Sequence, residues 1–256
     1  MTTALVKSNF SLFRMMWAEC KAEFLKAWRM PSFSVPTLIF PIAFYTMFGV
    51  VLGGDVSRAT YMLATYGIFA ALGPSLFSFG VSVATERDRG WLEVKRAAPM
   101  PFSGLMFARL FMAMIFALIV TLALFAVAYW GGGVRLAPVT WLSLVGLNLL
   151  TTIPFSLLGL SIGLRVRAQS AAAITNLLFF GFSLLGGLWV PITIFPKFMA
   201  IFALVLPSYH FGELALATIG QKSGYVPLMN IAAALAFSML FAFLAHRAWR
   251  YMDKDR

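Results

Sequence analysis

The sequence has few charged residues, very few histidines and almost no cysteine. Charged residues make up 11% of its 256 residues, against roughly 25% in an ordinary soluble domain. The single cysteine, Cys20, excludes a disulfide framework and a multi-cysteine zinc or iron–sulfur site. The two histidines, His210 and His246, are too few for a histidine-rich metal centre. No GxxxxGK[ST] pattern occurs, so we expect no cofactor and no ATP bound through a P-loop in this chain.

Hydrophobic residues, in contrast, make up 61% of the chain, where roughly 45–50% is usual. A soluble core of this size could not bury that much apolar surface. The uncharged runs are 30–54, 59–85, 110–134, 136–164, 168–196 and 223–246. Each exceeds the ~20 residues that a helix needs to cross a bilayer, and none has the alternating ~10-residue pattern of a membrane β-barrel. The composition predicts an all-α polytopic membrane protein and excludes a soluble enzyme.

The positions of the basic residues predict the orientation of the spans. Sixteen of the 20 Lys and Arg residues fall in alternate gaps between runs, and only four fall in the other gaps. Basic residues stay on the cytoplasmic side, so we expect six spans in the plasma (inner) membrane, with both termini cytoplasmic. The net charge of +11 is then mainly a topology signal. No soluble basic patch remains, and we expect no nucleic-acid partner.

Residues 1–29 have an apolar stripe at helical spacing. Its members are Phe10, Phe13, Trp17, Cys20, Phe24 and Trp28. The pattern predicts an interfacial amphipathic helix on the inner leaflet, in contact with membrane lipids. The alternative is a helix that packs on a soluble partner, and the two are compatible.

Residues 191–222 are largely apolar but interrupted by proline, at Pro191, Pro196 and Pro207. The resulting pieces are too short to span the membrane. If the segment crossed the membrane once, the last span would be inverted and its basic C-terminal end would face outward, against the charge rule. We therefore predict an extracytoplasmic re-entrant hairpin of two half-helices that meet near Pro207. Tyr209, His210 and Glu213 lie in it, and polar side chains at membrane depth are candidates for a gate or substrate path. The alternative is that Glu213 caps a half-helix or pairs with a neighbouring helix.

The loop after the second span, 86–101, is short and densely charged. Gly90 interrupts it, and Trp91, Leu92 and Val94 form a small apolar patch. A short amphipathic helix just outside the membrane suits docking into a groove on a cytoplasmic partner. A merely solvated loop would not explain Trp91.

The string GLSIG at 159–163 matches the nucleophile-elbow pattern, which requires a strand–turn–helix setting. Here it lies inside an apolar run, so we favour close helix packing through Gly159 and Gly163. An intramembrane serine protease that uses Ser161 and His246 remains the alternative.

Three strings together resemble the type-2 ABC exporter permease family along nearly the whole chain. They are PTLIFPIAFYTMFG at 36–49, ERDRGWLE at 86–93 followed by Pro99, and GLWVPITIFP at 187–196 continuing to PSYHFGEL at 207–214. One departure is Lys95 with Arg96, where the family more often has apolar residues. The resemblance implies the same interfacial helix, six spans, coupling helix and re-entrant segment.

We interpret the chain as one permease domain over 1–256. Its parts are the interfacial helix 1–29, spans 30–54, 59–85, 104–134, 136–164, 168–190 and 223–246, coupling loop 86–101 and re-entrant segment 191–222. The expected ATPase-coupling residues are Glu86, Arg87, Gly90, Trp91, Leu92 and Glu93.

The resemblance implies a transport subunit without enzymatic activity of its own. A separate P-loop ATPase would bind ATP and Mg, and two copies, or this chain with a related permease, would form a dimer. The substrate would be an exported amphipathic, lipid-like or drug-like compound, or a glycan-lipid. A proton-coupled secondary transporter is the other alternative, although it would need paired broken helices.

Overall fold

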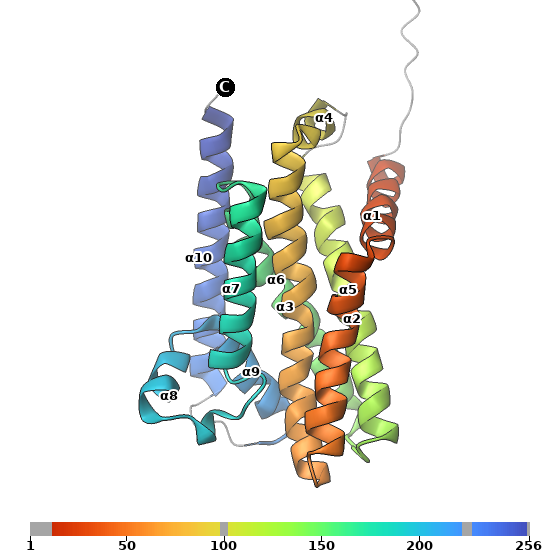
Figure 1. Cartoon of the computed structure of the whole chain (residues 1–256), viewed down its shortest axis with the longest axis vertical. Helices are drawn as coiled ribbons and strands as arrows, with labels where there is room; N and C mark the ends of the chain where they lie inside the picture. The colour runs from red at the N-terminus through yellow and green to blue at the C-terminus, as the bar shows by residue number, and fades with distance from the viewer. Residues whose placement is uncertain (1–11, 98–101, 222–226, 255–256) are drawn as a thin grey trace, which may run out of the picture.

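The computed structural model describes residues 12–97, 102–221 and 227–254, and these contain helices and turns but no strand. The helices are α1 (Leu12–Trp28), α2 (Pro31–Phe44), the π-helix η1 (Tyr45–Val51), α3 (Val56–Asp88), α4 (Trp91–Ala97), α5 (Phe102–Trp130), α6 (Pro138–Gly163), α7 (Ala168–Leu185), the 3-10 helix η2 (Ile192–Ile194), α8 (Lys197–Ala203), α9 (Pro207–Thr218) and α10 (Pro227–Lys254). The long helices run side by side as a bundle (Figure 1).

Six helical segments are long and apolar enough to cross a membrane. They are Pro31–Val51, Val56–Asp88, Phe102–Trp130, Pro138–Gly163, Ala168–Leu185 and Pro227–Tyr251. Helices satisfy all their backbone hydrogen bonds internally, which hydrocarbon surroundings require. The predicted all-α polytopic membrane protein with six spans is confirmed.

Proline and aspartate mark several helix starts. Pro31, Pro138 and Pro207 each occupy the first helical position, where the missing N–H costs nothing and the fixed φ suits the helix. Asp55 caps α3 by accepting a hydrogen bond from the Arg58 N–H at 2.7 Å. These residues therefore fix where α2, α3, α6 and α9 begin.

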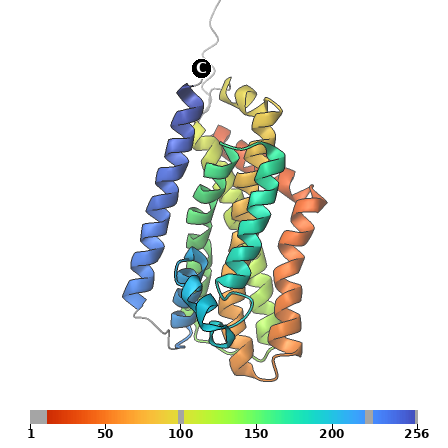
Figure 2. The same ribbon diagram turned by 60° about the vertical axis from the view of Figure 1, so that its left-hand side comes forward.

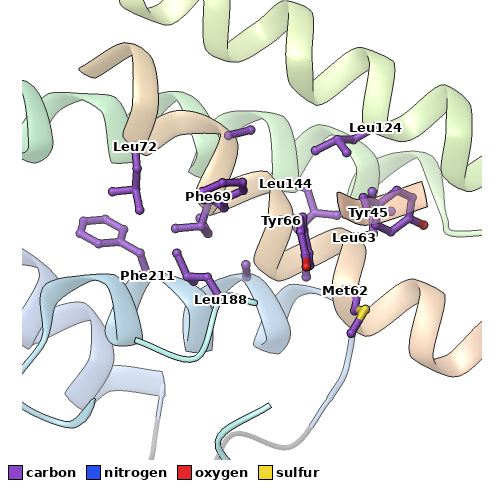
Figure 3. Close-up of a cluster of buried hydrophobic side chains, with 14 of the residues drawn as sticks. Tyr45, Met62, Leu63, Tyr66, Phe69, Leu72, Leu124, Leu144, Leu188 and Phe211 are labelled. Atoms are coloured by element: carbon purple, nitrogen blue, oxygen red, sulfur yellow. The ribbon is translucent and has the colours of Figure 1, made fainter. Parts of the chain in front are cut away.

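Helix α3 forms the centre of the bundle and is buried almost all round. Figure 3 shows its Tyr66 and Phe69 among side chains from neighbouring segments, including Leu124 of α5, Leu144 of α6 and Phe211 of α9. The side chains of α2 and α10 are far more exposed. Because other helices surround α3 and shield it from lipid, its side chains contact most of the bundle.

The two glycines of GLSIG lie against α3. A Cβ on Gly163 would lie 2.5 Å from the Phe79 carbonyl oxygen, and one on Gly159 would lie 3.1 Å from the Gly80 nitrogen. Only glycine permits this approach of the α6 and α3 backbones. The prediction of close packing is confirmed.

Helix α1 packs on α5 through part of its apolar stripe. Phe24 and Trp28 contact Phe116, with ring centroids 5.7 and 6.2 Å away, and Trp17 lies 6.4 Å from Phe111. The stripe is thus used inside this protein, and its contact with the inner leaflet stays a prediction.

The helix predicted to couple to an ATPase and the segment predicted to be re-entrant lie at opposite ends of the bundle. Helices α1 and α4 and the C-terminal end of α10 lie at one end, and α8 and α9 at the other (Figures 1 and 2). Helices α8 and α9 are bent by 88° at the break before Pro207, where the sequence predicts the junction of two half-helices. The chain leaves α7 and enters α10 at this same end (Figure 1), and insertion of the segment into the membrane from the extracytoplasmic side stays a prediction.

Candidate functional site

A sharp turn separates the long central helix α3 from the short helix α4. Gly90 has a φ of +74°, in the left-handed region that glycine adopts without steric cost. Helix α4 begins at the next residue, so the turn projects it from the end of the bundle (Figure 1). The predicted short helix after the second span is present, and residues 98–101, the rest of the coupling loop, lie outside the described residues.

Helix α4 buries one apolar side chain and exposes two. Leu92 is 2% exposed and packs with Phe79 and Val83 of α3 and with residues of α6 and α10. Trp91 and Val94 are 58% and 60% exposed. The apolar patch predicted from the sequence is therefore divided into an anchor and an outward face.

Six charged side chains from four helices meet beside α4, and we call them the charge cluster. They are Glu19, Glu23 and Lys26 of α1, Glu86 of α3, Lys95 of α4 and Arg109 of α5. Three acids face three bases, so the cluster is neutral overall. Only charges that are paired and hydrogen-bonded can be buried at a tolerable cost.

Arg109 lies inside the cluster and is 2% exposed. Its Nη2 donates to Oε1 of Glu23 at 3.1 Å and to Oε2 of Glu86 at 2.7 Å. Its Nε and Nη1 are buried and have no hydrogen-bond partner within the described part of the chain. One guanidinium thus joins α5 to both α1 and α3 with part of its hydrogen-bonding capacity unused.

The two lysines close the cluster from the solvent side. Lys95 Nζ donates to Oε1 of Glu23 at 2.6 Å and to Oε1 of Glu19 at 3.0 Å. Lys26 donates to Oε1 of Glu86. Lys95 therefore attaches α4 directly to α1.

The charges in the cluster stabilise each other's ionised forms. Burial on its own raises the pKa of Glu23, but Arg109, Lys26 and Lys95 together outweigh burial and lower this pKa to about 2. Burial lowers the pKa of Lys95, while Glu23 and Glu86 raise it, and the net shift is upward. Glu23 and Lys95 are therefore both charged at neutral pH in this arrangement.

Arg87, an expected coupling residue, and its neighbour Asp88 bind the turn between α6 and α7. Arg87 donates to the carbonyl oxygens of Gly163 at 3.2 Å and Val166 at 2.8 Å. Asp88 accepts from the Ala168 N–H at 2.7 Å, at the start of α7. These contacts attach the end of α3 to its neighbours instead of presenting Arg87 outward.

The expected coupling residues thus separate into three groups. Trp91 and Glu93 are exposed, Leu92 and Glu86 are buried, and Arg87 is half-buried against the α6–α7 turn. Only Glu86 of the cluster was among the expected coupling residues, and Glu19, Glu23, Lys26, Lys95 and Arg109 were not. The available signal was a charged Arg109 just inside an apolar span, which requires partners at that depth.

The residues expected to form a gate lie at the opposite end, in α9. His210 is buried, with Nδ1 2.9 Å from Oδ1 of Asn230 and Nε2 2.9 Å from the Leu204 carbonyl oxygen. Tyr209 is also buried, and Glu213 is half-buried and interacts electrostatically with Tyr61 of α3. His210 joins α9 to α10 and to the break before α9, which is a structural position.

The protease alternative is not favoured. Ser161 is buried, and its hydroxyl donates to the Leu158 carbonyl oxygen of the same helix at 2.7 Å. His246 is exposed on α10, and no hydrogen bond joins the two side chains in the described residues. The described residues also contain no group of three or more His, Cys, Asp or Glu residues that could hold a metal ion.

The sequence of this chain is similar to those of known membrane transport proteins. The sequence profile described as "ABC-2 type transporter" matches residues 14–220. "Putative transport permease YvfS" of Bacillus subtilis (strain 168) is 30% identical over 228 residues, which cover 88% of this chain and 92% of that protein. Permeases of this family normally pair with an ATP-binding subunit and are not themselves enzymes. With its six apolar helical segments, the chain is a multi-pass membrane permease that belongs to the ABC-2 type transporter family.

Proposed function

We propose that the chain is the membrane subunit of an ATP-driven exporter and that α4 receives the force from a separate P-loop ATPase. The observation that carries this proposal is the charge cluster beside the exposed Trp91 and Val94. An exposed apolar pair on a short helix suits a groove on a partner, and the cluster ties the same helix to α1, α3 and α5.

A push on α4 would move two attachments together. Leu92 is packed against α3, α6 and α10, and Lys95 is bonded to α1. Because α3 contacts most of the bundle, displacement of its end would reach the whole membrane part. The unused donors of Arg109 would allow a second arrangement of the acids, as a two-state element needs.

Replacing Trp91 tests this coupling role. Trp91→Ala should weaken binding of the ATPase subunit by about 30-fold or more, since truncation of an interface hot spot costs about 2 kcal/mol. The matched control is Trp130→Ala, which removes an 80% exposed tryptophan at the far end of α5. Binding is measured by co-purification, and coupling by ATP-dependent transport in proteoliposomes. Equal loss in both variants, or loss in neither, would contradict the assignment of α4.

The proposed orientation has α1 and α4 in the cytoplasm, with the plasma membrane around the bundle. A cysteine at Ser57 should react with an impermeant thiol reagent from outside, and one at Ala168 should not. Cys20 is buried, so its lack of reaction would not report sidedness. Labelling of Ala168→Cys in intact cells would overturn this orientation.

The proposed cargo is an amphipathic, lipid-like or drug-like compound, or a glycan-lipid, carried by a dimer of this chain or by its pair with a related permease. The short connections 52–55 and 131–137 leave no large outer domain for cargo. The proton-coupled alternative is not favoured, because the described residues contain a single bent helix pair, α8 with α9, where repeats would predict two. ATP-independent uptake by the purified chain would favour it instead.

A further inference from the structure

A cavity of about 450 Å³ opens beside the charge cluster, and we call it the head cavity. Lys26, Arg89 and Lys95 line it, together with Glu86. Glu86 is already bonded to Arg109 and Lys26, so its charge is compensated. Arg89 is exposed and has no ion pair in the described part of the chain. Lys26 and Lys95 are paired with acids of the charge cluster, which is neutral overall. The uncompensated charge at this wall is therefore the guanidinium of Arg89, which complements an anion.

A second cavity, of about 380 Å³, runs along α2, α3 and α7, and we call it the tail groove. Its walls are mainly apolar and include the phenylalanines Phe40, Phe69, Phe77, Phe179 and Phe180. Phe40 and Phe180 are about half exposed at its edges. A groove of this composition suits an apolar chain or ring system.

The two cavities are neighbours with a common wall. Met30, Val81 and Ser82 line both of them. A molecule at this junction would place one part among cations and another among phenylalanines. This continuity argues for one amphiphilic ligand rather than two unrelated ones.

We propose that the head cavity and tail groove together bind an amphiphile with an anionic phosphate or carboxylate headgroup, and that this is the cargo class of the exporter. The headgroup lies against Lys26, Arg89 and Lys95, and the tail lies along α2, α3 and α7. The assignment of this ligand as cargo rests on the proposed export function. Trp91 also lines the head cavity, so lipid binding is tested on Arg89 and Ser82 without the ATPase, and ATPase binding is tested on Trp91.

The binding test uses the purified full chain without any partner. Native mass spectrometry compares dioleoyl phosphatidic acid with dioleoyl phosphatidylcholine, which has the same tails. We expect tighter binding of phosphatidic acid, and about tenfold weaker binding after Arg89→Gln, because a charge-assisted hydrogen bond is worth about 1.5 kcal/mol or more. The matched control, Arg250→Gln, removes an exposed guanidinium from α10 and should leave binding unchanged. Equal affinity for the two lipids would overturn the proposal.

A second pair of variants tests the tail. Ser82→Trp fills the junction between the cavities, whereas Ser143→Trp adds the same ring on an exposed position of α6. We expect phosphatidic acid binding to fall only in Ser82→Trp, and excess inorganic phosphate not to displace the lipid. If inorganic phosphate alone displaces the lipid, or if Ser82→Trp binds it fully, no lipid tail enters the groove. The groove would then be free for another occupant, such as a second copy of the chain.

The cargo assignment needs one more measurement. With the ATPase present, a fluorescent phosphatidic acid should move across proteoliposomes faster with ATP, and Arg89→Gln should slow it. If the lipid binds but ATP does not move it, while Trp91 still controls ATPase binding, the site holds a resident lipid and the cargo assignment is wrong. If Trp91→Ala has no effect but selective binding persists, the export proposal fails and the site remains.

Discussion

The two ends of the bundle handle buried polar groups in opposite ways. At one end, six charges from α1, α3, α4 and α5 neutralise one another across long distances in the sequence. At the other end, His210 bonds Asn230 and a backbone carbonyl from positions close by in the chain. The first arrangement joins helices by charge, and the second fixes one segment by local hydrogen bonds.

This difference indicates which end can transmit movement. A charge interaction falls off slowly with distance, so the cluster can shift and still hold its helices together. A hydrogen bond weakens steeply when its distance or angle changes, so α9 is held in one position. We therefore assign the moving contacts to the α4 end and the fixed contacts to the α9 end.

Removing Arg109 should have the largest effect on this comparison. Arg109→Met leaves Glu23 and Glu86 buried without their shared partner, which should lower the free energy of unfolding by about 3–5 kcal/mol. Arg58→Met, at an exposed position near the start of α3, should change it little. Thermal unfolding in detergent measures both. Equal effects of the two variants would show that the cluster contributes nothing particular to stability.

Acid should weaken the cluster end before the other. The folded pKa of Glu23, about 2, lies below its ordinary value of 4.5. Its contribution to stability is therefore complete above pH 4.5 and is lost as the pH falls toward 2, by a few kcal/mol in total. Unfolding followed against pH should show this slope, and Glu23→Gln should reduce it. An unchanged slope in Glu23→Gln would show that this carboxylate does not set the acid sensitivity of the cluster.

Breaking the His210–Asn230 pair should have a smaller effect. Either His210→Leu or Asn230→Leu leaves a buried polar partner unsatisfied, at a cost of about 1–3 kcal/mol. The double variant should lose less than the sum of the two, because both partners are then apolar. Additive losses would show that the two side chains do not stabilise each other.

Glu213→Gln should have the smallest effect on stability, below about 1 kcal/mol, because the two side chains have nearly the same shape. If Glu213 belongs to a gate, the loss of charge should still change the transport rate. Tyr61→Phe, which removes the hydroxyl near Glu213, should change it in the same direction. Unchanged transport in both variants would leave Glu213 with a structural role only.

Helix number, the close approach of α6 to α3 and the break before Pro207 follow from local features of the sequence. Long uncharged runs, Gly159 with Gly163, and proline act through their own neighbours in the chain. Which side of α4 is buried could not be predicted, because Trp91, Leu92 and Val94 are all apolar residues and only the structure shows that Leu92 is the buried one. The position of Glu86 did not follow either, because its partners Lys26 and Arg109 come from other helices.

The sequence by itself determined that this chain is a six-span helical membrane protein, because bilayer thickness sets the length of an apolar run. Only the tertiary structure decided which charges meet. Arg109 lies 86 residues from Glu23 and 23 from Glu86, and packing of α1, α3 and α5 brings them together. Sequence spacing predicts the face of a single helix, but a contact between helices depends on how each is rotated and placed against its neighbours.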